Sequence, residues 1–141
     1  RRARAAAQNI VPTTTGAAIA VTQVLPELHD RFDGISVRVP TIVVSLTDFT
    51  FLLKQKTTKE EINQVLKEAS QSVRYKNVLA VTDEPLVSSD FIGNPYSSTV
   101  DLSMTVVVDG DFVKVVAWYD NEWGYSNRLV EMAIHTGLTK E

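Results

Sequence analysis

The chain has 141 residues with 44% hydrophobic and 22% charged side chains, and it contains no cysteine. This composition is ordinary for a globular protein, so we expect one domain over residues 1–141 that buries its core without disulfides. The net charge of −3 argues against general nucleic-acid binding, and the absence of cysteine excludes a thiolate metal site or a cysteine nucleophile within these residues.

The first third of the chain predicts one helix and two strand-forming segments. Small apolar residues over Ala17–Leu25 follow a run of threonines and end at Pro26, which favours a helix. Ile35–Val39 alternates apolar and polar residues and predicts a half-buried strand. Thr41–Leu53 is rich in β-branched and aromatic residues and is long enough for one bent strand or two.

The middle of the chain carries the clearest helix signal. Thr58 and Glu61 have the spacing of a capping box, and an apolar stripe continues to Ser72, so a helix is predicted over Thr58–Ser72. Short strands are expected at Val78–Thr82 and Leu86–Ser88.

The last third predicts a hairpin followed by a helix. Strands are expected at Thr99–Val108 and Phe112–Tyr119, joined by the turn signal Asp109-Gly110, and a helix from about Glu122 to Gly137. These elements together predict an α+β fold with a mixed, largely antiparallel sheet covered by helices on one face. No glycine-rich dinucleotide or nucleotide phosphate loop is present in the sequence.

One candidate anion site lies at the start of the first predicted helix. The run Thr13-Thr14-Thr15-Gly16 offers hydroxyl and backbone N–H groups there, while Arg2 precedes it and Arg38 lies in an apolar strand. A helix N-terminus with two guanidinium groups suits a phosphorylated ligand. The alternative is that the threonines only cap the helix and that the arginines are solvated.

A second candidate site lies between the last strand and the last helix. In the segment from Trp118 to Arg128, Asn121 offers an amide to a planar ligand amide, and Tyr125 offers a ring. The alternative is a helix cap at Asp120 or Asn121 surrounded by aromatic packing, and the spacing leaves both open.

Other polar residues give weaker signals. His29 and His135 have no neighbouring nucleophile or carboxylate in a triad spacing, and two histidines are too few for a metal cage, so we expect both to be structural or exposed and no metal to be bound. Ser88-Ser89-Asp90 suits a turn or a cap better than a nucleophile elbow.

An ordered series of motifs resembles the phosphorylating glyceraldehyde-3-phosphate dehydrogenases, in the C-terminal part of their catalytic domain. The series reads AAQNIVPTTTGAA, VLPEL, RVPT, VSSDF, SST and WYDNEWGYSNR and covers essentially the whole chain. The resemblance implies an NAD-dependent, cytoplasmic, glycolytic homotetramer whose substrates are a phosphorylated aldehyde and inorganic phosphate, with no metal, nucleic acid or membrane partner.

The resemblance also implies roles for individual residues. Arg38 would bind the C3 phosphate of the substrate, and Thr15, Gly16 and Arg2 would form part of the inorganic phosphate site. Asn121 would hydrogen-bond the nicotinamide carboxamide, with Tyr125 near the same ring.

The family's chemistry proceeds through a thioester on a cysteine that a histidine activates. In the family both residues precede the RRARAAAQN segment, as does the Rossmann domain that binds NAD. The chain begins in mid-pattern without methionine, so we expect it to be a piece of a longer protein, with no catalytic residue of its own and no activity by itself.

Two alternatives stay open. The family commonly reads RVPTPNVS, whereas this chain has Ile42 and Val43 at the proline and asparagine positions. Ile42 resembles the erythrose-4-phosphate dehydrogenase branch, which is the runner-up activity. The third hypothesis is a stand-alone, non-enzymatic binding module.

Overall fold

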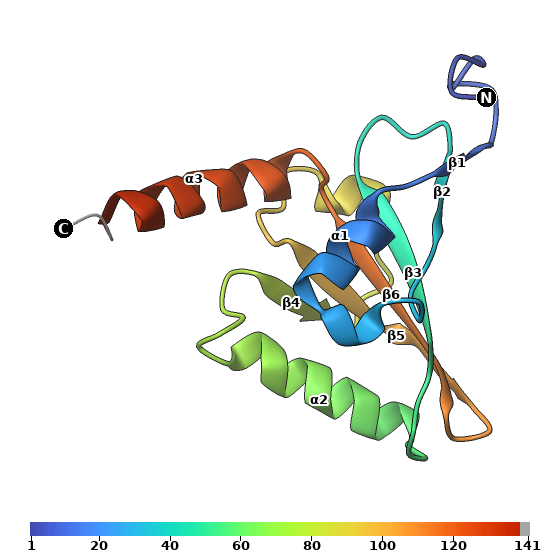
Figure 1. Cartoon of the computed structure of the whole chain (residues 1–141), viewed down its shortest axis with the longest axis vertical. Helices are drawn as coiled ribbons and strands as arrows, with labels where there is room; N and C mark the ends of the chain where they lie inside the picture. The colour runs from blue at the N-terminus through green and yellow to red at the C-terminus, as the bar shows by residue number, and fades with distance from the viewer. Residues whose placement is uncertain (139–141) are drawn as a thin grey trace. The chain divides into compact units, whose positions relative to one another are not determined.

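The computed structural model describes residues 1–138 (Figure 1), which divide into two compact units, Arg1–Ile42 and a second unit that begins at Val43. The expected single domain over residues 1–141 stays a prediction. Within residues 1–138, no helix combines the length and the apolar character needed to cross a lipid bilayer.

The N-terminal unit contains a two-stranded antiparallel ribbon and a short helix. Strand β1 (Val11–Thr14) pairs with β2 (Ile35–Arg38), and α1 (Ala17–Val24) with the 3₁₀ turn η1 (Pro26–Leu28) lies between them in sequence. The predicted helix and the predicted strand over β2 are confirmed, whereas β1 was not expected. Pro12 lies inside β1, where its missing N–H group is tolerated because the ribbon has only two strands.

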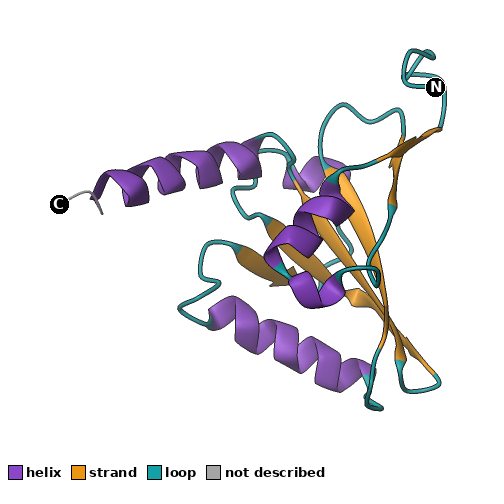
Figure 2. Cartoon of the chain, viewed as in Figure 1, coloured by secondary structure: helices purple, strands orange, loops and turns teal. Residues whose placement is uncertain are grey.

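The C-terminal unit is built on a four-stranded sheet with the order β3-β6-β5-β4. Figure 2 shows the strands in orange. Its strands are β3 (Ser45–Leu52), β4 (Leu79–Thr82), β5 (Ser98–Val108) and β6 (Phe112–Tyr119). The pairs β3–β6 and β5–β6 are antiparallel, and β4 runs parallel to β5. The predicted mixed, largely antiparallel sheet is therefore confirmed.

The hairpin between β5 and β6 has the predicted turn. Asp109 and Gly110 both adopt positive φ angles, 49° and 76°, within the three-residue connection 109–111 between the paired residues Val108 and Phe112. The Lys56 ammonium lies 3.0 Å from the Asp111 carboxylate and also donates to the Asp109 carbonyl oxygen. The segment after β3 is thereby attached to the turn.

Helix α2 (Lys59–Gln71) begins at the predicted capping box. The Thr58 hydroxyl accepts from the Glu61 N–H at 3.2 Å, and the Glu61 carboxylate accepts from the Thr58 N–H at 3.1 Å. Ile62 and Leu66 pack from α2 onto one face of the sheet. The buried core residues beneath them are Val100, Leu102, Val113, Val115 and Ala117.

Two segments differ from their predicted structure. Leu86–Ser88 is not a strand: it leads into the 3₁₀ turn η2 (Ser88–Phe91), and the Asp90 carboxylate accepts from the Val87 N–H at 2.8 Å. Of the segment Thr41–Leu53, only β3 is a strand. Val44, just before it, has a φ of 76°, which breaks the extended conformation.

Helix α3 (Trp123–Leu138) leaves the sheet at the end of β6 and extends away from it (Figure 1). Its beginning is buried at Gly124, but most of its large apolar side chains are exposed. These exposed side chains are Leu129, Val130, Met132, Ile134 and Leu138. The sheet therefore holds α3 at its N-terminal end.

Candidate functional site

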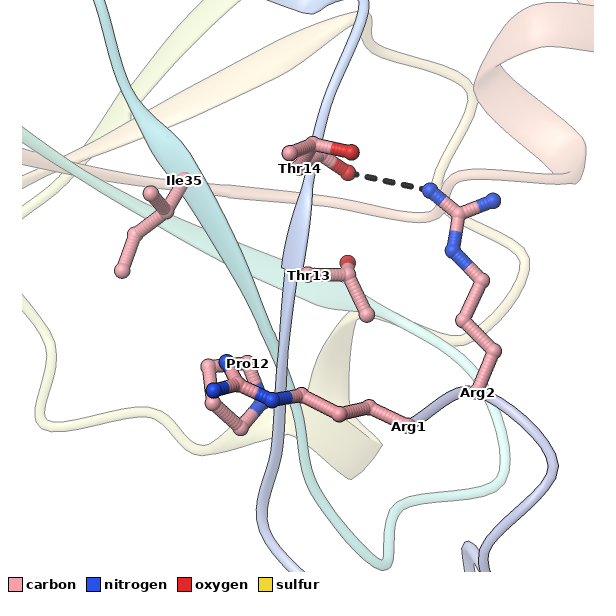
Figure 3. Close-up of a pocket in the computed structure, with 6 residues that line it drawn as sticks. All are labelled: Arg1, Arg2, Pro12, Thr13, Thr14 and Ile35. Atoms are coloured by element: carbon pink, nitrogen blue, oxygen red, sulfur yellow. Dashed lines mark hydrogen bonds between the residues drawn. The ribbon is translucent and has the colours of Figure 1, made fainter.

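Two guanidinium groups lie beside the threonine run in the N-terminal unit. The Arg2 Nη2 donates to the Thr14 carbonyl oxygen at 3.1 Å (Figure 3). An open hollow of about 450 Å³ is formed here by Arg1, Arg2, Pro12, Thr13, Thr14 and Ile35. The Thr13 hydroxyl is buried without a hydrogen-bond partner among the described residues. Positive charge and an unpaired hydroxyl at one hollow suit an anion.

The start of α1 follows directly after this hollow in the chain. Gly16 is the N-cap residue, and the Thr15 hydroxyl accepts from the Ala17 N–H at 3.1 Å. A Cβ atom placed on Gly16 would meet no atom within 4 Å, so the chain itself gives no steric reason for glycine there. The N-terminal N–H groups of a helix attract negative charge. The Thr15 hydroxyl thus contacts the first N–H group of α1, while the N-cap Gly16 itself stays sterically open.

Arg38 lies at the opposite end of the β1–β2 ribbon from Thr15 and Gly16. It pairs with Val11, whereas Thr14 pairs with Ile35. Three residues of strand correspond to roughly 10 Å. Among residues 1–138, the Arg38 guanidinium has no hydrogen-bond or ion-pair partner, and its side chain is exposed. The structure therefore brings Arg2 to the threonines but leaves Arg38 available for a separate anion.

In the C-terminal unit, Asn121 and Tyr125 lie at the corner between β6 and α3. Asn121 is exposed in the turn, and Tyr125, the third residue of α3, has 68% of its surface exposed. Neither side chain is used in the core. An exposed amide and an exposed ring a turn apart are groups that can bind a planar ligand carrying an amide.

Asp120 holds this corner in place. Its carboxylate accepts from three backbone N–H groups: Trp123 at 2.9 Å, Glu122 at 3.0 Å and Gly93 at 2.8 Å. The hydrogen bond from Trp123 is the main cause that lowers the pKa of Asp120, although burial acts in the opposite direction. The predicted helix cap is thus confirmed at Asp120, which leaves Asn121 free for another role.

Aromatic packing accounts for one of the two tryptophans. Trp118 stacks on Phe91 with ring centroids 5.3 Å apart, and its indole N–H donates to Asp101 at 3.4 Å. Trp123, at the start of α3, is half exposed. The two interpretations of this segment therefore apply to different residues: Asp120 and Trp118 are structural, and Asn121 and Tyr125 are available to a ligand.

One contact at this corner was not predicted from the sequence. The Ser45 hydroxyl donates to the Asn121 Oδ1 at 3.3 Å. The two residues are 76 positions apart and meet only because β3 pairs with β6. No local motif signals such a contact, and a sequence signal would require knowledge of the strand register.

The histidines lie outside both candidate sites. His29 follows η1, and its Nδ1 lies 3.0 Å from the exposed Asp30 carboxylate. His135 lies in the last turns of α3 and is exposed. Among residues 1–138, no group of three or more histidine and acidic side chains is arranged to hold a metal ion.

The fold defines the class of the chain as an α+β protein with a mixed, largely antiparallel sheet. Residues 1–121 match the family model described as glyceraldehyde 3-phosphate dehydrogenase, C-terminal domain. The chain belongs to this family.

Similar curated proteins carry the same name. The chain is 56% identical over 139 residues to glyceraldehyde-3-phosphate dehydrogenase of Zymomonas mobilis, with 99% of this chain and 41% of that protein covered. It is 58% identical to glyceraldehyde-3-phosphate dehydrogenase 2 of Synechocystis over 94% of the chain and 39% of the relative. It is 54% identical to glyceraldehyde-3-phosphate dehydrogenase 1 of Bacillus subtilis over 96% of the chain and 40% of the relative. The chain thus spans about two fifths of the length of these relatives.

Proposed function

We propose that these residues form part of the catalytic domain of an NAD-dependent, phosphorylating glyceraldehyde-3-phosphate dehydrogenase. The reaction would oxidise glyceraldehyde 3-phosphate to 1,3-bisphosphoglycerate through a cysteine thioester. Membership of the family carries this proposal. A cytoplasmic, glycolytic homotetramer is part of it, and the cysteine and its histidine partner would come from residues outside this sequence.

Different residues would bind the two phosphates of this reaction. Arg38, exposed at the end of β2, would bind the C3 phosphate of the aldehyde, because its guanidinium has no competing partner among the described residues. Thr15, Gly16 and Arg2 would bind inorganic phosphate. Their separation along the ribbon supports two phosphate positions.

Asn121 and Tyr125 would bind the nicotinamide side of NAD. These two residues fit a ring that carries a carboxamide, because the Asn121 amide and the Tyr125 ring, four residues further along the chain, are both exposed. When bound, NAD accepts the hydride of the oxidation. Asn121 would orient the carboxamide by a hydrogen bond, and Tyr125 would cover the ring; neither residue transfers a proton.

A hybrid enzyme tests this proposal. In the hybrid, this chain replaces the matching 139-residue part of the Zymomonas mobilis relative. We expect turnover that requires glyceraldehyde 3-phosphate, NAD and inorganic phosphate together. A folded hybrid without this activity would contradict the proposed function. The 141-residue chain alone, which has no cysteine, serves as the inactive control.

One residue favours a second substrate, erythrose 4-phosphate. Ile42 stands directly after the RVPT motif where the family commonly has proline. The ratio of kcat/KM for the two aldehydes in the hybrid enzyme decides between them. We expect the three-carbon aldehyde to be preferred, and a higher kcat/KM for the four-carbon aldehyde would reverse the assignment.

A non-enzymatic binding module is the remaining alternative. The intact mass of the gene product distinguishes it. A product that begins at Arg1 by design would favour the module, and a longer product would favour the enzyme.

A further inference from the structure

The backbone of Asn121 and its side chain are held by different residues. Asp120, only 4% exposed, fixes the backbone after Asn121 by accepting from the Glu122 and Trp123 N–H groups, and it also accepts from the Gly93 N–H. These contacts leave rotation about the Asn121 side-chain bonds free. An amide presents a carbonyl oxygen on one side and two N–H donors on the other, so its orientation decides what it can bind.

Ser45 contacts the Asn121 side chain. It is the first residue of β3 and pairs with Tyr119, two residues before Asn121. Its hydroxyl donates to the Asn121 Oδ1 at 3.3 Å. Among residues 1–138, the Asn121 Nδ2 has no hydrogen-bond partner. The amide oxygen is therefore engaged, and both N–H donors remain available.

The residue before Ser45 has an unusual backbone conformation. Val44 is buried and adopts a φ of 76°, in the left-handed region that a β-branched residue rarely occupies. Such conformations are concentrated at sites where a neighbouring group must be placed in one position. Here the neighbouring group is Ser45, at the point where β3 begins.

We propose that Ser45 is a positioning residue for the cofactor site. By donating to the Asn121 amide oxygen, its hydroxyl turns the amide nitrogen toward the ligand, where it can donate to the carbonyl oxygen of a carboxamide. This inference rests on the proposed function. In this role Ser45 acts through the Asn121 amide and not directly on the ligand.

The test compares Ser45→Ala and Ser45→Thr in the hybrid enzyme. Removal of one neutral hydrogen bond changes affinity by about two- to tenfold. We expect Ser45→Ala to raise KM for NAD by that factor, with KM for the aldehyde and for phosphate unchanged. Ser45→Thr keeps a hydroxyl and should restore KM for NAD. Thr50→Ala removes an exposed hydroxyl from the same strand and should change none of these constants.

The outcomes separate the two proposals. An unsubstituted hybrid without NAD-dependent turnover overturns the proposed function and, with it, the role of Ser45. An active hybrid in which Ser45→Ala leaves KM for NAD unchanged overturns the role of Ser45 alone. Equal increases in KM for NAD, aldehyde and phosphate would also overturn it, since they would indicate a general disturbance of the strand.

Discussion

Arg38 is the clearest test of the anion-binding proposal at the scale of single residues. A charge-assisted hydrogen bond contributes about 1.5–3 kcal/mol, so Arg38→Ala should raise KM for the phosphorylated aldehyde roughly ten- to a hundredfold. KM for NAD should stay unchanged. Steady-state kinetics of the hybrid enzyme measures both constants.

Arg31→Ala is the matched control, because it removes an exposed positive charge from the same unit. It should leave KM for the aldehyde unchanged. If Arg38→Ala lowered only the thermal midpoint and left both KM values unchanged, Arg38 would be a solvated strand residue.

Asp120 should make the stability of the chain depend on pH. Its folded-state pKa is lowered from the ordinary value of 3.8, mainly by the Trp123 N–H. The Asp120 charge therefore contributes fully to the free energy of unfolding above about pH 3.8. This contribution is lost as the pH falls through the lowered folded-state pKa. Asp120→Asn, which carries no charge, should be less stable than the wild type at neutral pH.

Urea denaturation of both proteins measures this difference. It should shrink as the pH falls below 3.8, and a difference that is independent of pH would contradict a role for the charge. Asp120→Ala removes all three acceptor contacts and should cost about 2 kcal/mol at neutral pH.

Two glycines of α3 should respond in opposite directions to alanine. A Cβ on Gly124 would lie 3.0 Å from the Tyr96 carbonyl oxygen, whereas a Cβ on Gly137 would meet nothing within 4 Å. Gly137→Ala should stabilise the chain by up to about 1 kcal/mol through helix propensity. In Gly124→Ala the backbone clash should offset that gain and lower the thermal midpoint. Equal stabilisation by both variants would show that the backbone near Tyr96 shifts to accommodate a Cβ atom on residue 124.

At the scale of elements, α2 depends on its capping box. The Thr58 hydroxyl is the acceptor for the Glu61 N–H, so Thr58→Ala should lower the free energy of unfolding by about 1 kcal/mol. Thr58→Ser keeps the acceptor and should lose little. Chemical denaturation measures both, and an equal loss in the two variants would assign the effect to packing of the Thr58 methyl group.

The elements with local signals were predictable from the sequence. The capping box of α2 and the Asp109-Gly110 turn each lie within a few residues, so the elements they start or join were found. Strand β1 was missed because Pro12 interrupts its pattern and its partner β2 is distant in sequence. The strand expected at Leu86–Ser88 was wrong because Asp90 folds that segment into a turn.

The candidate site was predictable only in part. Arg2, Thr15 and Asn121 belong to motifs that can be read along the chain. The contact between Ser45 and Asn121 depends on the β3–β6 register, and the left-handed Val44 depends on its tertiary surroundings. Long-range pairing of this kind leaves no pattern in a single segment.

At the scale of the whole chain, stability should be distributed unevenly between α2 and α3. Helix α2 packs on the buried core, whereas α3 exposes most of its large apolar side chains. Amide hydrogen exchange should therefore be slow in α2 and faster in the second half of α3, because local opening is easier where few apolar contacts are broken. Equal protection of the two helices in the 141-residue chain would contradict this.

The order of the strands also has a consequence for synthesis on the ribosome. Strand β3 is made first in the C-terminal unit, yet its partner is β6, which begins at Phe112, 60 residues after Leu52 (112 − 52). At a translation rate of about 5–20 residues per second, synthesis of β6 begins roughly 3–12 s after β3 is complete. During that interval β3, which includes Phe49 and Phe51, has no strand to pair with. The nascent chain therefore carries an aromatic segment without its partner strand until β6 has been translated.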